Sequence, residues 1–125
     1  MVVDTSAILA VLFFDPGTEW AVAQLEEHAA VLRMSTVNLA ETLIRLRDRQ
    51  PQLADQLENQ ILDSGIRFVP PDAEQCRLAA EARGRFPLNL GDCFAYAAAQ
   101  TSGLKLAYKG NDFVHTDIDG VRFGA

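Results

Sequence analysis

The sequence predicts an α/β fold, a three-layer α/β/α sandwich with a central, mainly parallel β-sheet. Short apolar segments that suit buried strands alternate along the chain with longer segments of helical periodicity. This alternation is typical of parallel sheets whose strands are joined by right-handed crossovers and whose two faces are covered by helices. The 125 residues, 49% of them hydrophobic, suit a single domain over residues 1–125, with no linker or internal repeat.

The first segment of the chain has the pattern of a strand followed by a helix. Residues 2–3 are expected to form a buried strand, residues 4–6 a capping turn and residues 7–14 an apolar helix. A Pro-Gly pair ends this helix, and a second helix is expected from 18 to about 28. Residues 31–34 then form the next strand.

The middle of the chain predicts two amphipathic helices. Ser35 is placed to cap the first, in which apolar residues between 37 and 46 occupy about half of the circumference. Glu41 falls just outside that apolar arc. Pro51 is expected to begin the second helix, which Gly65 ends.

The last part of the chain alternates again between strands and helices. After a strand over 66–69, residues 72–75 resemble a capping box and open a helix that lasts until Gly84 or Phe86. Another helix begins at residues 91–92 and is apolar nearly all round, which predicts that it is buried. The remaining elements are a strand over 104–108, a turn over 109–113 and a final short strand near Ile118 or over 121–123.

Composition excludes several classes of function. The longest apolar runs, residues 7–14 and 93–99, are shorter than the roughly 20 residues that a membrane-spanning helix needs. The start of the chain has no secretory signal, so we expect a cytoplasmic protein with no membrane partner. Cys76 and Cys93 lack disulfide or zinc-site spacing and are expected to be buried free thiols. The net charge of −6 argues against binding nucleic acid through a basic surface, so such a substrate would be held locally, through a metal.

Acidic residues stand at the positions where a parallel sheet binds its ligands. Asp4 directly follows the first strand, Asp112 follows the strand over 104–108, and Asp92 begins the buried helix. Glu41 joins them from its helix. Each has a structural explanation of its own, because an aspartate caps helices or forms turns and a glutamate is often a solvated helical residue.

Taken together, the four carboxylates predict a metal site. At a separation of about 4 Å and an effective dielectric near 20, each like-charged pair would cost roughly 4 kcal/mol, which favours proton uptake or a bound cation. Oxygen ligands without histidine or cysteine favour Mg²⁺ or Mn²⁺ over zinc. Such an ion activates water and stabilises charge on a phosphodiester, so the chemistry indicated is that of a nuclease.

Characteristic motifs occur along nearly the whole chain: Val3-Asp4-Thr5-Ser6-Ala7, Glu41, Leu90-Gly91-Asp92-Cys93-Phe94-Ala95-Tyr96-Ala97, Lys109-Gly110-Asn111-Asp112-Phe113 and Thr116-Asp117-Ile118. They resemble the motifs of VapC-like PIN-domain ribonucleases, the toxins of type II toxin–antitoxin systems. The resemblance implies that Asp4, Glu41, Asp92 and Asp112 form an acidic quartet that binds Mg²⁺, for which Mn²⁺ substitutes, and cleaves RNA to 3′-hydroxyl and 5′-phosphate ends. It also implies a cognate antitoxin protein, a homodimer, and a heterotetramer or larger assembly with the antitoxin.

Three further polar residues are candidates to support the site. Ser6 is a candidate to contribute a hydroxyl, and Asn111 and Asp117 to bind substrate or water, although each equally suits a turn or a cap. The loop over 83–89 is shorter than in many relatives, which puts substrate affinity in question. The arginines at 45, 47 and 49 suit either a solvated helical face or contact with RNA.

Other residues and functions fit the pattern less well. His28 and His115 lack ligand-like spacing and take no part in the expected chemistry. A phosphorelay receiver would need a phosphoacceptor aspartate after a mid-chain strand, but the mid-chain aspartates at 48, 55 and 63 fall in predicted helices. A PIN fold kept only for protein binding would have no physical reason to retain all four carboxylates.

Overall fold

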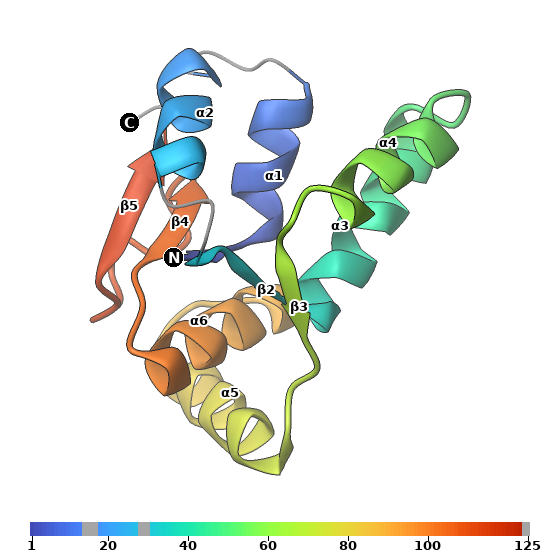
Figure 1. The fold of residues 1–125 in the computed structure, drawn as a ribbon. Helices are drawn as coiled ribbons and strands as arrows, with labels where there is room; N and C mark the ends of the chain where they lie inside the picture. Colours follow the sequence, from blue (N-terminus) through green and yellow to red (C-terminus); the bar gives the residue numbers. More distant parts are fainter. Residues whose placement is uncertain (14–17, 28–30, 124–125) are drawn as a thin grey trace.

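The computed structural model describes residues 1–13, 18–27 and 31–123 and has the α/β architecture that the sequence predicts (Figure 1). In the described residues, two helices follow each of the first three strands, and the last two strands are joined without a helix. The helices are α1 Thr5–Leu12, α2 Thr18–Glu27, α3 Thr36–Arg49, α4 Ala54–Leu62, α5 Ala73–Arg85 and α6 Leu90–Ser102. The strands are β1 Val2–Val3, β2 Arg33–Ser35, β3 Arg67–Val69, β4 Leu106–Lys109 and β5 Gly120–Phe123.

The sheet has the strand order β3-β2-β1-β4-β5, and each pairing among its described strands is parallel. The shortest strand, β1, is central: Val2 pairs with Arg33 of β2 and with Leu106 of β4, and Val3 pairs with Ala107. Because both neighbours of β1 run in the same direction, the residues that follow β1 and β4 emerge at one edge of the sheet.

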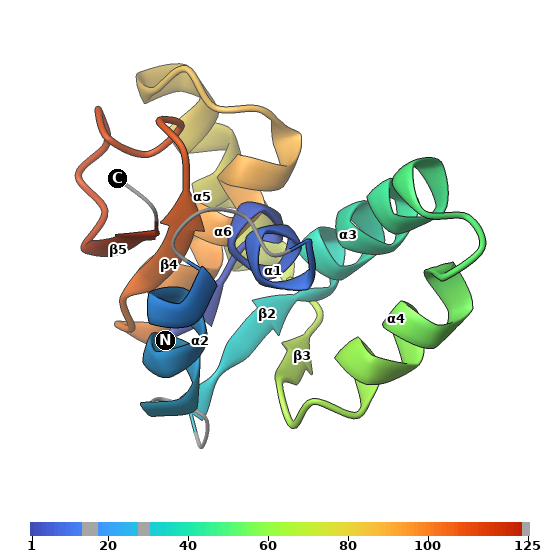
Figure 2. The ribbon, with the colours of Figure 1, turned by 90° about the horizontal axis from the view of Figure 1, so that it is seen from above.

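Helices cover both faces of the sheet, which makes the three layers (Figures 1 and 2). Consecutive strand residues point to opposite faces, and Val3 lies in one apolar core while Val2 lies in the other. The core containing Val3 is packed by α1 to α4, with Ile8, Leu46 and Ile61 among its buried side chains. No helix within the described ranges is long and apolar enough to cross a membrane.

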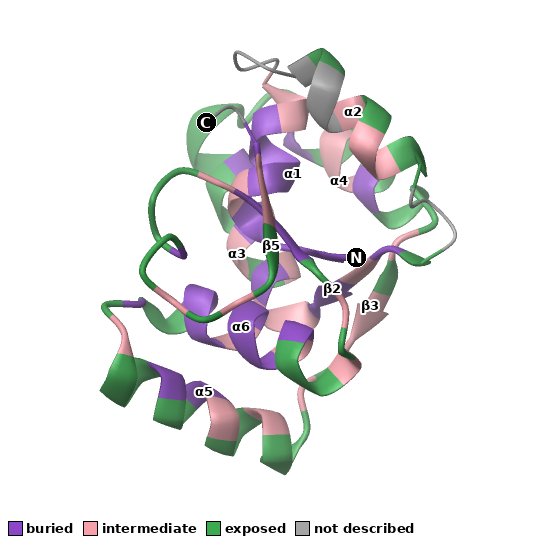
Figure 3. Cartoon of the chain, turned by 90° about the vertical axis from the view of Figure 1, so that its left-hand side faces the viewer, coloured by how far each residue is buried: buried purple, intermediate pink, exposed green. Residues whose placement is uncertain are grey.

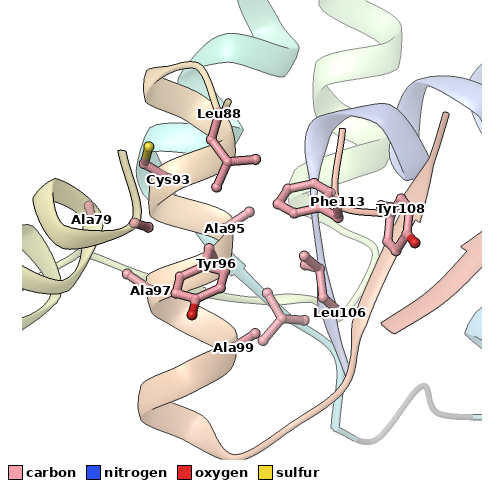
Figure 4. Packing of buried hydrophobic residues seen from close by; sticks show 12 residues of the cluster. Ala79, Leu88, Cys93, Ala95, Tyr96, Ala97, Ala99, Leu106, Tyr108 and Phe113 are labelled. Carbon is pink, nitrogen blue, oxygen red and sulfur yellow. The ribbon is translucent and has the colours of Figure 1, made fainter. Parts of the chain in front are cut away.

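The second core lies between the sheet and α6, with α5 outside it. Small side chains of α6, among them Ala95 and Ala99, let the helix approach Leu106 and Phe113 closely (Figure 4). Helix α6 is buried along most of its length, as its all-round apolar pattern predicts, whereas α5 is buried along one side (Figure 3). Cys93 is buried in this core, but Cys76 is exposed, so the prediction of a buried thiol is wrong for Cys76.

Several element boundaries differ from the predicted ones. Helix α4 begins at Ala54 rather than Pro51, because the intervening residues form a turn in which the Leu53 amide donates to the Gln50 carbonyl at 3.0 Å. Strand β2 extends to Ser35, which pairs with Val69 before it caps α3. The second helix ends at Glu27 in the described residues, and residues 14 and 28 of the predicted helices lie outside them.

Candidate active site

Asp4 lies at the carboxyl end of β1 and caps α1. Its backbone amide donates to the Ala107 carbonyl of β4 at 3.2 Å, and its Oδ1 accepts from the Ala7 amide at 3.1 Å. The residue is only 4% exposed. One aspartate therefore ends the central strand, starts the first helix and leaves a buried carboxylate at the edge of the sheet.

Ser6 connects Asp4 to the neighbouring strand. Its hydroxyl donates to Asp4 Oδ1 at 2.7 Å and accepts from the backbone amide of Lys109 at 2.8 Å. Since Lys109 is the last residue of β4, this pair of hydrogen bonds fixes the Asp4 carboxylate relative to the turn that carries Asp112. Of the three supporting residues predicted from sequence, Ser6 is the one that contacts an acidic candidate.

Asp92 lies in the first turn of α6, where it completes a capping box with Asn89. The Asn89 side-chain oxygen accepts from the Asp92 amide at 2.8 Å, and Asp92 Oδ2 accepts from the Asn89 amide at 3.3 Å. The helix cap is therefore Asn89, and Asp92 is the third helical residue, where the positive end of the helix dipole favours its charge. Asp92 is 8% exposed, so its carboxylate is held in one orientation and largely buried.

Glu41 reaches the same region from α3, and its carboxylate lies against Gly91, the residue before Asp92. A Cβ placed on Gly91 would stand 2.7 Å from Glu41 Oε2 and 2.8 Å from Oε1. On its other side, Glu41 pairs with Arg45 at 3.7 Å, and 27% of its side chain is exposed. Glu41 is thus a partly open carboxylate beside the start of α6.

The pKa values of the two buried aspartates show that the acidic groups act on one another. The pKa of Asp4 is raised to about 7, chiefly by burial; the charges of Asp92 and Glu41 contribute to the rise, and the hydrogen bonds from Ser6 and Ala7 oppose it. The pKa of Asp92 rises to about 6, again chiefly because of burial, and the charges of Asp112 and Glu41 add to it. The carboxylates therefore concentrate negative charge at the carboxyl ends of the strands, and Arg45 offsets it only in part.

Asp112 lies in the turn after β4 with an exposed side chain, close enough for its charge to raise the pKa of Asp92. In the described part of the chain, no three Asp, Glu, His or Cys side chains are grouped so that they could together hold a metal ion. The donor set nevertheless fits an ion such as Mg²⁺, which commonly keeps several waters while one or two carboxylates hold it. The assignment of these carboxylates as metal ligands stays a prediction.

The other two supporting candidates have structural partners outside the acidic group. Asn111 accepts a hydrogen bond from the Arg122 guanidinium through its side-chain oxygen. Asp117 accepts from the Tyr96 hydroxyl at 2.6 Å and pairs with Arg85 at 3.2 Å, and these contacts lower its pKa. Both residues hold the segment between β4 and β5 in place.

The three arginines of α3 have different surroundings. Arg47 pairs with Asp55 and Glu58 of α4, and Arg49 lies over the Phe13 ring at 4.0 Å, so both join α3 to its neighbours. Arg45 alone pairs with a candidate site residue, Glu41, and its charge also lowers the pKa of Asp92. Of the three, Arg45 is the one whose charge acts on the acidic residues, and contact of these arginines with RNA stays a prediction.

A buried polar network holds α3 against α1 and α6, and sequence reasoning missed it. The side-chain amide of Asn38 donates to the backbone carbonyl of Gly91 at 3.0 Å. The hydroxyls of Thr5 and Thr42 donate to the Asn38 carbonyl at 3.1 Å and 2.7 Å. The signal in the sequence was the i, i+4 spacing of Asn38 and Thr42, two polar residues that the structure buries on the helix that carries Glu41.

Comparison with known proteins identifies the family. The family model of the PIN domain matches residues 1–119. The chain belongs to the PIN-domain family. Ribonuclease VapC42 of Mycobacterium tuberculosis is 37% identical over 128 residues, which cover 94% of this PIN domain and 96% of the relative. Ribonuclease VapC of Mycolicibacterium smegmatis is 36% identical over 129 residues, which cover 97% and 99%. The VapC resemblance predicted from the motifs is confirmed.

Solved structures support the fold of this PIN domain. Mycobacterium tuberculosis VapC20, described as a sarcin-ricin loop cleaving toxin, aligns with a TM-score of 0.79 and 22% identity over 94% of this chain and 95% of that one. A chain of VapBC2 from Rickettsia felis, solved bound to a DNA fragment from its promoter, aligns with a TM-score of 0.79 and 15% identity over 98% and 97%. At these identities the agreement concerns the fold.

The structure argues against a phosphorelay receiver. Asp48 lies in α3, Asp55 lies in α4, and Asp63 is the residue that ends α4. None of these mid-chain aspartates follows a strand, so none is placed as a phosphoacceptor. Of the two histidines, His115 does not belong to the acidic group, and His28 lies outside the described residues.

Proposed function

We propose that this PIN domain is a divalent-metal-dependent endoribonuclease that acts as the toxin of a toxin–antitoxin pair. The observation that carries the proposal is the pair of buried carboxylates, Asp4 and Asp92, at the carboxyl edge of the sheet. The chain is also 37% identical to a VapC ribonuclease along 94% of its length. Burial of two mutually repelling carboxylates is costly for folding alone, whereas it suits a site that binds a cation.

The cation we propose is Mg²⁺, with Mn²⁺ as a substitute. The acidic and hydroxyl side chains around Asp4 and Asp92 supply oxygen ligands, which favour hard divalent ions. When bound, the ion would stabilise the charge that develops on the phosphodiester and orient an attacking water.

We assign different roles to the buried and the exposed carboxylates of this chain. Asp4 and Asp92, both held by helix-capping hydrogen bonds, would hold the ion in a fixed place. Glu41 and Asp112 are more exposed, and we assign them to the side of the site that faces substrate and water. Ser6 would keep the Asp4 carboxylate oriented. Hydrolysis in this arrangement would leave 3′-hydroxyl and 5′-phosphate ends.

A protein partner follows from the same proposal. The net charge of −6 favours a basic partner, and we propose that an antitoxin places a basic side chain among the carboxylates. We further propose a homodimer that assembles with antitoxin into a heterotetramer or larger complex, located in the cytoplasm with its RNA substrate. Solved relatives of the fold include toxin–antitoxin complexes, such as one from Klebsiella pneumoniae.

The direct test is RNA cleavage by the purified, antitoxin-free protein. Total RNA would be incubated with the wild type in Mg²⁺, with the wild type in EDTA, and with Asp92→Asn in Mg²⁺, and new 5′ ends would be mapped. We expect discrete cuts in the first reaction only. The loss in the variant should reach at least about 100-fold, because the amide cannot replace a charged ligand.

Asp72→Asn is the matched control for this experiment. Asp72 also forms helix-terminal hydrogen bonds, but at the exposed start of α5, where asparagine caps equally well. The control should cleave like the wild type. Cuts that persist in EDTA and in Asp92→Asn would contradict the metal site, and no cuts by a folded wild type would favour a PIN fold kept for protein binding.

A further inference from the structure

The Glu41 carboxylate lies close to the start of α6 because residue 91 is a glycine, which has no side chain. Gly91 is buried in the first turn of α6, and the three atoms nearest to a Cβ placed there are all in the Glu41 carboxyl group, at 2.7, 2.8 and 2.9 Å. Contacts below 3.0 Å essentially never occur for real Cβ atoms. A side chain at position 91 and the present position of the Glu41 carboxylate therefore exclude each other.

We propose that Gly91 is a positioning residue for the acidic site, because its lack of a side chain lets the Glu41 carboxylate lie beside Asp92. This inference rests on the proposed function and adds to it a residue that touches neither metal nor RNA. The reason for glycine here is close approach rather than backbone conformation, since Gly65, Gly103 and Gly110 are the glycines with positive φ in the described residues, and Gly91 does not share it.

Hydrogen bonds hold the backbone of Gly91 in place beside α3. Its carbonyl accepts from the buried side-chain amide of Asn38 at 3.0 Å. The backbone carbonyl of Asn38 in turn accepts from the hydroxyls of Thr5 and Thr42. Asn38 also lies on α3, one turn before Glu41, so this network fixes the distance between the α3 backbone and Gly91. The flexible group in the contact is the Glu41 side chain, and it is the part that an alanine would displace.

A displaced Glu41 carboxylate would leave the acidic group in the direction of solvent. Its side chain is already 27% exposed and pairs with Arg45, which is itself half exposed. The move therefore costs little folding energy, because the carboxylate becomes better hydrated and separates from two buried like charges. The fold should tolerate Gly91→Ala while the metal site loses a nearby negative charge.

The test is to compare Gly91→Ala with Gly84→Ala in Mn²⁺ binding, followed by electron paramagnetic resonance of free Mn²⁺, and in thermal unfolding without metal. Gly84 is also helical, lies in the last turn of α5 and would have no neighbouring atom within 4 Å of an added methyl group. Both alanines should leave the melting temperature unchanged or raised, since alanine favours helix. Gly91→Ala alone should weaken Mn²⁺ binding, by about 10- to 100-fold.

Two double variants separate positioning from a general structural effect. The side chain in Glu41→Asp is one methylene shorter. This substitution alone should weaken Mn²⁺ binding, but combined with Gly91→Ala it should restore part of the Mn²⁺ affinity that Gly91→Ala loses. In metal-free unfolding, Gly91→Ala should raise the melting temperature more in the Glu41→Ala background than alone, because the clash is then absent.

The outcomes distinguish this inference from the proposed function. Mn²⁺ binding by Gly91→Ala equal to that of the wild type overturns the inference. It is also overturned if the effects of the substitutions at positions 41 and 91 simply add in both double variants, on Mn²⁺ affinity with Glu41→Asp and on melting temperature with Glu41→Ala. A wild type that binds no Mn²⁺ overturns the proposed metal site instead, and the positioning role falls with it.

Discussion

Asp4 and Asp72 begin helices through the same local chemistry but differ in burial. Each is an N-cap whose Oδ1 accepts a backbone amide of the first turn, from Ala7 and Gln75 respectively. Asp72 is exposed, whereas Asp4 is 4% exposed and has a pKa of about 7. Capping explains why an aspartate suits both positions, but only the buried one carries an unfavourable charge when ionised.

Asp4→Asn should therefore stabilise the metal-free protein. Asparagine keeps the acceptor for Ser6 and Ala7 and is an equally good cap, while the buried charge disappears. At about pH 8 we expect a gain of roughly 1–4 kcal/mol in the free energy of unfolding, measured with urea in EDTA. Asp72→Asn, the matched control, should change stability little. A less stable Asp4→Asn protein would show that the ionised carboxylate contributes to the fold.

Sequence position predicted the acidic residues but not the residues that arrange them. Asp4 and Asp112 were found because each follows a strand, and Asp92 because it lies at the start of a buried helix. Gly91 and Asn38 were missed because their importance lies in contacts between α3 and α6, about fifty positions apart in the chain. A glycine without positive φ leaves no local signal that its Cα must contact a distant carboxylate.

At the scale of elements, Asp117 joins the segment between β4 and β5 to both α6 and α5. The Tyr96 hydroxyl donates to Asp117 at 2.6 Å, and Arg85 pairs with the other oxygen of Asp117. The same segment carries Phe113, which packs into the core beside Tyr108. Asp117, a candidate for the chemistry on sequence grounds, is in this structure a residue that fixes a loop.

Tyr96→Phe should destabilise the protein by about 1 kcal/mol, because it removes a hydrogen bond to a charged acceptor that is partly exposed. Urea unfolding at neutral pH measures this loss. Tyr108→Phe is the control, since in the part of the chain that the structure describes its hydroxyl makes no hydrogen bond and its ring contact with Phe113 would persist. Equal stability of Tyr96→Phe and the wild type would contradict the role assigned to Asp117.

Element boundaries show where local patterns are insufficient. Pro51 suits the first turn of a helix, yet α4 begins three residues later, because the Gln50 to Leu53 turn satisfies the backbone between α3 and α4. Similarly, Ser35 was expected only as a cap, but it also ends β2. In both cases one residue suits two structures, and the tertiary arrangement decides between them.

At the scale of the whole molecule, the alternation of strands and helices predicted the layers, but not the order of the strands. The two-residue strand β1 is central and is paired on both sides, although its length alone would suggest an edge. Its central place follows from Val2 and Val3, which fill opposite cores. The same placement puts Asp4 between the ends of its neighbours, so the fold and the site depend on one short strand.

The buried aspartates also determine the sign of the pH dependence of stability. Both have folded-state pKa values above the ordinary aspartate value of 3.8, about 7 for Asp4 and about 6 for Asp92, so the folded state binds more protons than the unfolded state between those limits. The contribution of these two aspartates to the free energy of unfolding is then greatest below about pH 4, and it is lost as the pH rises through 6 and 7. Asp117 and Glu74 have lowered pKa values, so their contributions are already complete above about pH 5.

Metal-free protein should therefore lose stability between about pH 5 and pH 8, by up to about 1.4 kcal/mol per pH unit for each proton released. In Asp4→Asn this slope should be smaller, and the difference between the two slopes measures Asp4 together with its charge coupling to Asp92 and Glu41. Millimolar Mg²⁺ should reduce the loss in the wild type at about pH 8, where both carboxylates are ionised, and have less effect at about pH 5, where protons compete with the cation. Urea unfolding at both pH values, with EDTA or Mg²⁺, measures all of these contributions. Parallel slopes for the wild type and Asp4→Asn would mean that Asp4 is ionised throughout this range, and the electrostatic argument for a cation at the end of β1 would then fail.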